Sequence, residues 1–203
     1  MSEDTITRLA HTFKATFDQF YDAPLAVWKE FAAQGCIEEF QKNDVLKTEH
    51  TKENYFYFML EGSAGVFVWK ENNWACLDFA FQGHFFGDYM SIITGQATPL
   101  QTMVLEKSLL FKMKRSAYIE LGQTEFGSVL TKFAAEFSYL SKQQQQIDLL
   151  TKTAEQRYLE LLSREPQIIH KVAQKHLASF LGITPQSFSR IRKSIAEQDQ
   201  ILP

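Results

Sequence analysis

The stretch from Gln174 to Lys193 restricts the fold more than any other part of the sequence. Its apolar residues recur at helical spacing on both sides of Gly182, and glycine readily takes the left-handed conformation that ends a helix. Thr184 and Pro185 follow, and these residue types favour the cap and the first turn of a new helix. The pattern predicts two short helices joined by a tight turn. Their inward faces consist of Leu177, Phe180, Leu181, Phe188, Ile191 and Ile195.

The second of these helices carries a polar face opposite its apolar residues. Gln186, Ser189, Arg190 and Lys193 lie on that face. The major groove of DNA admits one helix and presents base edges to amide, hydroxyl and guanidinium groups, and arginine can bind guanine through two donors. The face therefore favours DNA recognition. The alternative is a helical hairpin whose polar face is simply solvated.

Charge is distributed unevenly along the chain. Residues 1–150 hold 13 Lys and Arg against 19 Asp and Glu, a net charge of −6, whereas residues 151–203 hold 8 against 5, a net charge of +3. An acidic body with a basic C-terminal part indicates that only this part meets a polyanion, because it alone attracts phosphates and releases their counterions. An ordinary uneven surface is the other interpretation.

A heptad-like ladder of apolar residues precedes the basic part. Its members are alternately four and three residues apart, as in the seam of a coiled coil. Gln144 stands at a core position, where a polar residue often fixes the register of paired helices. We expect this helix to join two copies of the chain, although it could instead pack on its own domain. The predicted dimer interface is Phe126, Leu130, Phe133, Phe137, Leu140, Gln144 and Ile147.

Upstream of the ladder, the spacing of the apolar residues changes twice. Residues 5–34 predict two short helices broken near Pro24. From Cys36 to about Met113, short aromatic and β-branched runs alternate with turn residues such as Glu61-Gly62-Ser63, which predicts a small antiparallel roll and an α+β fold. We expect three regions: a sensor domain at 1–122, a dimerisation helix at 123–150 and a DNA-binding domain at 151–203.

Several function classes lack their sequence signatures. No apolar run reaches the eighteen or so residues of a membrane helix, and the acidic N-terminus does not match a secretory signal. The motifs GxSxG, GxxxxGK[ST], GxGxxG and HExxH are absent. Cys36 and Cys76 lack chelating spacing, so we expect two buried, reduced thiols and no metal site. These observations predict a cytoplasmic protein without membrane contact that is not an enzyme.

The order of these parts resembles the Crp/Fnr family of bacterial transcription regulators over essentially the whole chain. The most specific match runs from Ala178 to Arg192 (ASFLGITPQSFSRIR). Tyr57 to Gly62 and Gly83 to Asp88 are similar to a strand-to-turn segment and to the phosphate-binding cassette of the family's cyclic-nucleotide-binding domain. The resemblance implies that residues 186, 187 and 190 contact bases. The candidate DNA-binding residues are Thr184, Gln186, Ser187, Ser189, Arg190 and Lys193, with Lys175 and Arg192 placed for phosphates.

The cassette departs from that of the family's cyclic AMP-binding members. Where they carry an Arg-Ser pair, this chain has Thr98-Pro99, so no arginine neutralises a cyclic phosphate and proline removes a backbone donor. The central-helix positions that hold the adenine carry Lys142 and Gln143 instead of the usual Thr-Ser. The resemblance implies an effector pocket at Gly87, Asp88, Thr98, Lys142 and Gln143. We do not expect cyclic AMP there, nor any other cofactor.

We therefore expect a homodimeric, sequence-specific transcription regulator that binds a double-stranded DNA operator and acts on RNA polymerase. Its roll is either a sensor for a small effector or the remnant of one. The sequence ends at Pro203, which leaves no room for the wing hairpin usual in the family, so the recognition helix should carry more of the contacts. The alternative is a small-molecule-binding signalling protein whose helix-turn-helix serves protein contacts. A steep salt dependence of DNA binding distinguishes the regulator from the alternative.

Overall fold

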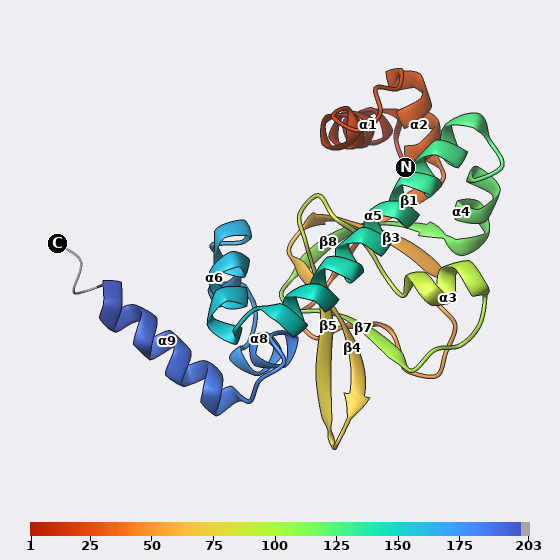
Figure 1. Ribbon diagram of the computed structural model, residues 1–203. Helices are drawn as coiled ribbons and strands as arrows, with labels where there is room; N and C mark the ends of the chain where they lie inside the picture. Colours follow the sequence, from red (N-terminus) through yellow and green to blue (C-terminus); the bar gives the residue numbers. More distant parts are fainter. Residues whose placement is uncertain (200–203) are drawn as a thin grey trace.

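The structure, a computed structural model, describes residues 1–199 as two N-terminal helices, a roll of antiparallel strands, one long helix and a group of C-terminal helices (Figure 1). The predicted α+β fold is confirmed. The first helices are α1 (Glu3–Phe17) and α2 (Leu25–Ala33). Pro24 is the N-cap of α2, so the predicted break between the two helices near Pro24 is confirmed.

The roll consists of two four-stranded antiparallel sheets, ordered β1-β8-β3-β6 and β2-β7-β4-β5. Tight turns connect neighbouring strands. Glu71 and Asn72 both have positive φ angles and form the two-residue turn between β4 and β5, the type that matches strand twist. Gly62 has a φ of +102°, and a Cβ there would meet Ser108 Oγ at 2.3 Å, so only glycine fits. The strands are β1 (Gly35–Phe40), β2 (Val45–Lys47), β3 (Tyr55–Glu61), β4 (Ser63–Lys70), β5 (Asn73–Phe81), β6 (Phe85–Phe86), β7 (Leu100–Val104) and β8 (Ser108–Lys114).

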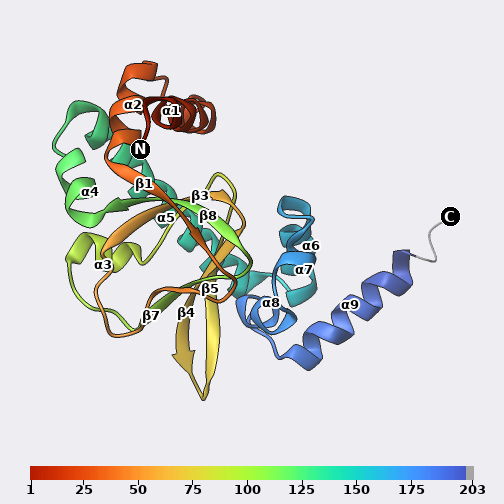
Figure 2. The same ribbon diagram turned by 180° about the vertical axis from the view of Figure 1, so that it is seen from behind.

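Helices α1 and α2 cover the sheet that contains β1, β3 and β8 (Figure 2). Phe13 of α1 is fully buried, and its ring lies 5.0 Å from that of Phe58 and 5.1 Å from that of Phe111. Trp28 and Phe31 of α2 complete the same aromatic core. Each such side chain stabilises the fold by roughly 1.5–3 kcal/mol through burial. The two helices are therefore part of the roll's core.

Two short helices lie between these strands and before the long helix. Helix α3 (Tyr89–Thr94) lies between β6 and β7, and α4 (Arg115–Leu121) leads into the long helix α5 (Glu125–Thr151). After α5, the chain turns at Lys152 and continues through the remaining helices: α6 (Ala154–Arg164), α7 (Ile168–Lys171), α8 (Gln174–Phe180) and α9 (Pro185–Asp199). We expected no wing hairpin after the recognition helix; this prediction falls on residues after Asp199, which lie outside the described residues.

The C-terminal helices share one hydrophobic core with the roll, formed mainly where α8 packs on β5. The ring of Phe180 lies 4.9 Å from that of Phe79, and the imidazole of His176 lies 4.8 Å from the ring of Phe67. Ser179 Oγ accepts a 2.9 Å hydrogen bond from the Cys76 backbone N–H. We call these contacts the α8–β5 interface. It attaches the first helix of the helix-turn-helix to the sheet that carries β5.

The two cysteines differ in environment. Cys76 is buried in the shared core, and burial raises the pKa of its thiol. Cys36 is exposed, so the prediction of two buried thiols is wrong for Cys36. The reason is the alternation of side chains along β1: Ile37 packs against the core, so the neighbouring Cys36 points to the opposite side of the strand. Within residues 1–199, no helix is long and apolar enough to cross a bilayer, and no group of His, Cys, Asp and Glu side chains is arranged to hold a metal ion.

His176 makes the α8–β5 interface sensitive to pH. Its Nδ1 is buried without a hydrogen-bond partner, and desolvation, together with the nearby Lys175 charge, lowers the pKa of His176 to about 4. In the unfolded chain His176 has a pKa near 6.5, so as the pH falls the unfolded state binds a proton at this histidine before the folded state does. The contribution of neutral His176 to the free energy of unfolding is therefore complete above pH 6.5 and is lost as the pH falls towards 4. We expect a loss of about 2 kcal/mol between pH 7.5 and 5 from this residue.

The measurement is the free energy of unfolding of the wild type minus that of His176→Gln at several pH values. The difference is needed because burial raises the pKa of Glu53 to about 7, which adds stability as the pH falls. His170→Gln is the control, since it removes an exposed histidine of α7. If the difference in the free energy of unfolding between the wild type and His176→Gln does not decrease below pH 6, the prediction is wrong.

Candidate nucleic-acid interface and effector site

The turn between α8 and α9 has the local geometry that its residues favour. Gly182 has a φ of +69°, and the N–H of Ile183 donates to the carbonyl of Ala178. Thr184 Oγ1 accepts a 3.1 Å hydrogen bond from the Ser187 backbone N–H, which satisfies one of the free donors at the start of α9. Phe188 is fully buried, with its ring 5.0 Å from that of Tyr158 on α6. These contacts fix which face of α9 points inward.

The outward face of α9 presents most of the predicted recognition residues. Gln186, Ser189, Arg190 and Lys193 are exposed, whereas Ser187 is half-buried and hydrogen-bonded to Thr184. Helix α9 extends away from the roll at the edge of the molecule (Figures 1 and 2). In these views the C-terminal half of α9 has no other element of residues 1–199 beside it.

The three basic candidate residues besides Arg190 have different surroundings. Lys175 is exposed on α8. Arg192 is half-buried, close enough to Tyr158 to influence the pKa of that phenol. Lys193 lies 3.7 Å from Glu197 in an exposed pair one turn along α9. Lys175 and Lys193 are therefore free to meet a phosphate, while Arg192 also packs against the helical core.

Arg157 of α6 positions the helix-turn-helix, and the sequence analysis assigned it no such role. Its Nη2 donates to the carbonyl of Leu181 at 2.6 Å, in the turn before α9, and its Nη1 donates to the carbonyl of Lys152 at the end of α5. The guanidinium thus connects the end of the long helix to the turn. Its partners are backbone carbonyls, which leave no signal in the side-chain pattern of the sequence.

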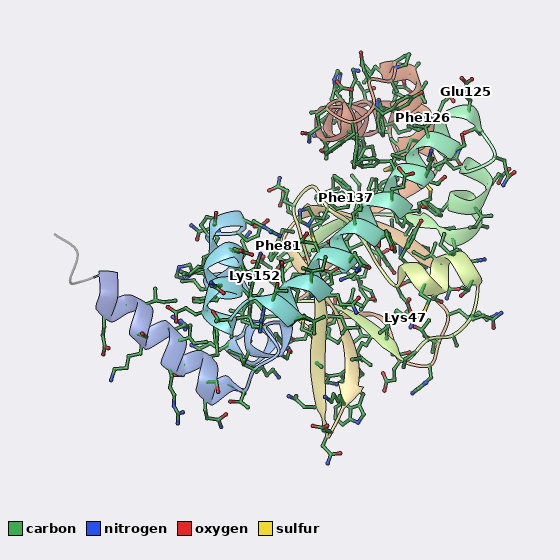
Figure 3. The ribbon with its side chains drawn as sticks, in the orientation of Figure 1. Lys47, Phe81, Glu125, Phe126, Phe137 and Lys152 are labelled. Atoms are coloured by element: carbon green, nitrogen blue, oxygen red, sulfur yellow. The ribbon has the colours of Figure 1, made fainter. Side chains whose placement is uncertain are left out.

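The predicted dimer residues on α5 divide into two groups. Phe126 and Leu130 pack in the core of their own protomer, and the ring of Phe133 lies 4.6 Å from that of Phe20. Further along α5, the seam faces solvent: Phe137 is 61% exposed, Leu140 65% and Ile147 43% (Figure 3). Gln144 is exposed and donates to Asp148 Oδ1 at 2.7 Å. The exposed part of the predicted seam therefore begins at Phe137.

The predicted effector residues do not all come together. Asp88 caps α3 and is fully buried, and Thr98 is 4% exposed with its hydroxyl bonded to the Asp88 carboxylate. Gly87 precedes Asp88 with a φ of +137°. Lys142 lies elsewhere: its ammonium pairs with Asp78 of β5 at 2.7 Å. Gln143 is exposed. The structure thus brings residues 87, 88 and 98 together and places the two α5 residues apart from that group.

Lys47 is the residue of this region that sequence analysis missed. Its ammonium lies 3.0 Å from Asp88 Oδ2, and the two side chains are 1% and 0% exposed. Lys47 therefore neutralises the buried Asp88 carboxylate from within the chain. A lysine in a three-residue strand gives no sign of burial, since such residues are mostly exposed. Glu53 is also buried nearby and accepts hydrogen bonds from the backbone N–H groups of Asn54 and Tyr55.

The roll and the helices that follow it are similar to known proteins. The family profile of the cyclic nucleotide-binding domain matches residues 37–125. Similar solved structures include FixK2 from Bradyrhizobium japonicum, with a TM-score of 0.69 and 16% identity over 81% of this chain and 86% of that chain. No curated protein sequence matches the chain.

Two other solved structures extend the comparison. The c-di-GMP responsive global regulator CLP of Xanthomonas campestris has a TM-score of 0.67 and 16% identity, over 87% of this chain and 93% of that chain. The catabolite activator protein of Thermus thermophilus has a TM-score of 0.53 and 20% identity, over 91% and 87% of the two chains. Both likenesses span the roll, the long helix and the C-terminal helices.

Proposed function

We propose that this protein is a homodimeric transcription regulator that binds a near-palindromic DNA operator. Two observations support the proposal: residues 37–125 match the cyclic nucleotide-binding domain, and more than four fifths of the chain has the fold of Crp/Fnr regulators. The proteins of this fold named above are regulators, and we propose no catalytic role. Operator binding requires access to the chromosome, so the proposal includes a cytoplasmic location. A regulator bound beside a promoter would act on RNA polymerase.

The exposed face of α9 is the observation that carries the proposal. Gln186, Ser189 and Arg190 are exposed on the side of α9 opposite the buried Phe188. Amide, hydroxyl and guanidinium groups are the ones that read base edges in the major groove. The basic charge of residues 151–203 supplies the attraction to phosphates that every such complex needs.

The exposed seam of α5 supports the dimer. Phe137, Leu140 and Ile147 follow one another at steps of three and seven along one side of the helix, and such a stripe on a long helix is covered when a second copy packs against it. Two copies related by a two-fold axis would present two recognition helices. Their half-sites should lie about one helical turn of DNA apart, near ~34 Å.

The test is selection of binding sequences from random double-stranded DNA by the purified protein, followed by affinity measurements over a range of salt concentrations. We expect an enriched near-palindrome and a steep fall of log K with log salt, by about 0.9 per phosphate neutralised. A protein-contact module would enrich no sequence and give almost no salt dependence. That result would reject the proposed function.

A further inference from the structure

The ammonium of Lys47 has a complete set of partners inside the roll. It donates to the carbonyl of Leu100 at 2.6 Å and to Thr98 Oγ1 at 3.1 Å, and it pairs with Asp88 Oδ2 at 3.0 Å. A longer contact of 3.3 Å joins it to the carbonyl of Thr48. These groups come from the residue after β2, from β7 and from the two ends of the segment 88–98. Lys47 lies close to β7 and α3 (Figure 3).

The segment 88–98 is closed by further buried hydrogen bonds. Asp88 Oδ1 accepts from the Ser91 backbone N–H at 3.0 Å, while Oδ2 accepts from Thr98 Oγ1. Ser91 Oγ accepts from the Glu53 backbone N–H at 2.8 Å and donates to the carbonyl of Gln96 at 2.6 Å. Asp88, Ser91 and Thr98 are each no more than 4% exposed. The polar side chains of the cassette are thus engaged with the chain itself.

We propose that Lys47 is an internal counter-charge that holds the segment 88–98 closed, so that the dimer reaches its DNA-binding form without an anionic effector. This rests on the proposed function and concerns its regulation. An anion entering here would have to separate Asp88 from its ammonium and would then lie beside a buried carboxylate, where like charges repel strongly because little water screens them. Lys47 therefore supplies the positive charge within the chain.

The closed segment is connected to the long helix by a specific contact. Arg115 Nε donates to the carbonyl of Ile92 in α3 at 2.6 Å, and Arg115 is the first residue of α4, which leads into α5. If the segment opens, α3 no longer presents this carbonyl in the same place. Loss of Lys47 is thus expected to disturb the position of α4 and, through it, the start of α5.

The first experiment compares two preparations of the wild type on the selected DNA. One is purified in its native form, and the other is unfolded in denaturant, freed of small molecules and refolded. We expect equal affinities within about twofold, a difference of about 0.4 kcal/mol. Added cyclic AMP or inorganic phosphate should change neither affinity, and calorimetry with either should give no saturable heat. Refolded protein that binds DNA only after cyclic AMP is added would overturn the proposal.

The second experiment uses Lys47→Met, which keeps the length of the side chain and removes its charge. We expect at least a tenfold loss of DNA affinity, about 1.4 kcal/mol, with the dimer retained. The double variant Lys47→Met/Asp88→Asn removes both charges and keeps a cap for α3, so it should recover part of the loss. Lys52→Met is the control, because Lys52 is exposed.

The outcomes separate this inference from the proposed function. Wild-type affinity in a folded Lys47→Met dimer would overturn the role of Lys47 and leave DNA binding intact. If Lys47→Met does not fold, the comparison of native and refolded wild type still decides whether an effector is needed. If no preparation enriches any DNA sequence, the proposed function itself fails, and the inference fails with it.

Discussion

Replacing Arg190 with alanine is expected to weaken operator binding by about ten- to a hundredfold per half-site at fixed salt, because a bidentate contact to guanine discriminates by roughly 1–3 kcal/mol. Arg190 is exposed on the outward face of α9, four residues from Gln186 and one from Ser189. The preference at one base pair in each half-site should relax. The measurement is the affinity for the selected operator and for its single-base variants.

Lys175→Ala is the matched control for Arg190→Ala. Lys175 is also an exposed cation of the helix-turn-helix, but it lies on α8. Its loss should weaken all sequences alike and reduce the salt slope by about one unit. If Arg190→Ala instead changes only the salt slope, residue 190 contacts the DNA backbone and the recognition helix is rotated from the orientation proposed here. If it changes neither, the DNA-binding proposal fails.

The double variant Phe137→Glu/Leu140→Glu is expected to sediment as a folded monomer. In the proposed dimer these side chains face a second copy, and four carboxylates would then be buried without partners, at a cost of several kcal/mol. Phe137 and Leu140 are 61% and 65% exposed in the single chain, so the change leaves the protomer's own core intact. Phe133 is unsuitable for this test, because it packs against Phe20.

Tyr139→Glu provides the control for the dimer test. Tyr139 is 67% exposed, as much as Leu140, but it lies on a different side of α5. We expect this variant to sediment as a dimer like the wild type. A dimer that survives Phe137→Glu/Leu140→Glu would show that the exposed seam is not the interface, whatever the effect on DNA binding.

The shape of the helix-turn-helix could be predicted from sequence because its determinants are local. Gly182 provides the positive φ angle, and Thr184 accepts the N–H of Ser187 only three residues away. Phe188 follows at helical spacing and is buried. Each of these effects acts within one turn of helix, so a short stretch of sequence contains all the information that it needs.

The environment of the cassette could not be predicted in the same way. The partners of Lys47 on Thr98 and Leu100 are 51 and 53 residues away in the chain. The pairing of β2 with β7 and the bridge between Thr51 and Thr98 bring them together. Strand β2 has three residues, too few to show an alternating pattern. Burial of a lysine depends on such distant partners, since the charge must be neutralised where it lies.

The long helix illustrates an intermediate case. Its periodicity identified one apolar face, but periodicity cannot say which neighbour covers each part of that face. Phe126 packs against Trp28 of α2, and Phe133 packs against Phe20 in the turn after α1, both about a hundred residues earlier in the chain. The first half of the ladder therefore belongs to the protomer's core, and only the second half is available to a partner.

The α8–β5 interface has a consequence for the exchange of parts between regulators. Phe180, His176 and Ser179 of α8 contact Phe79, Phe67 and Cys76 of the roll. A chimaera that joins these C-terminal helices to a foreign sensor would leave that apolar face uncovered and its polar contacts unmade. Transplantation should succeed only if the matching residues of β4 and β5 are carried along, so the transferable unit is larger than the helix-turn-helix itself.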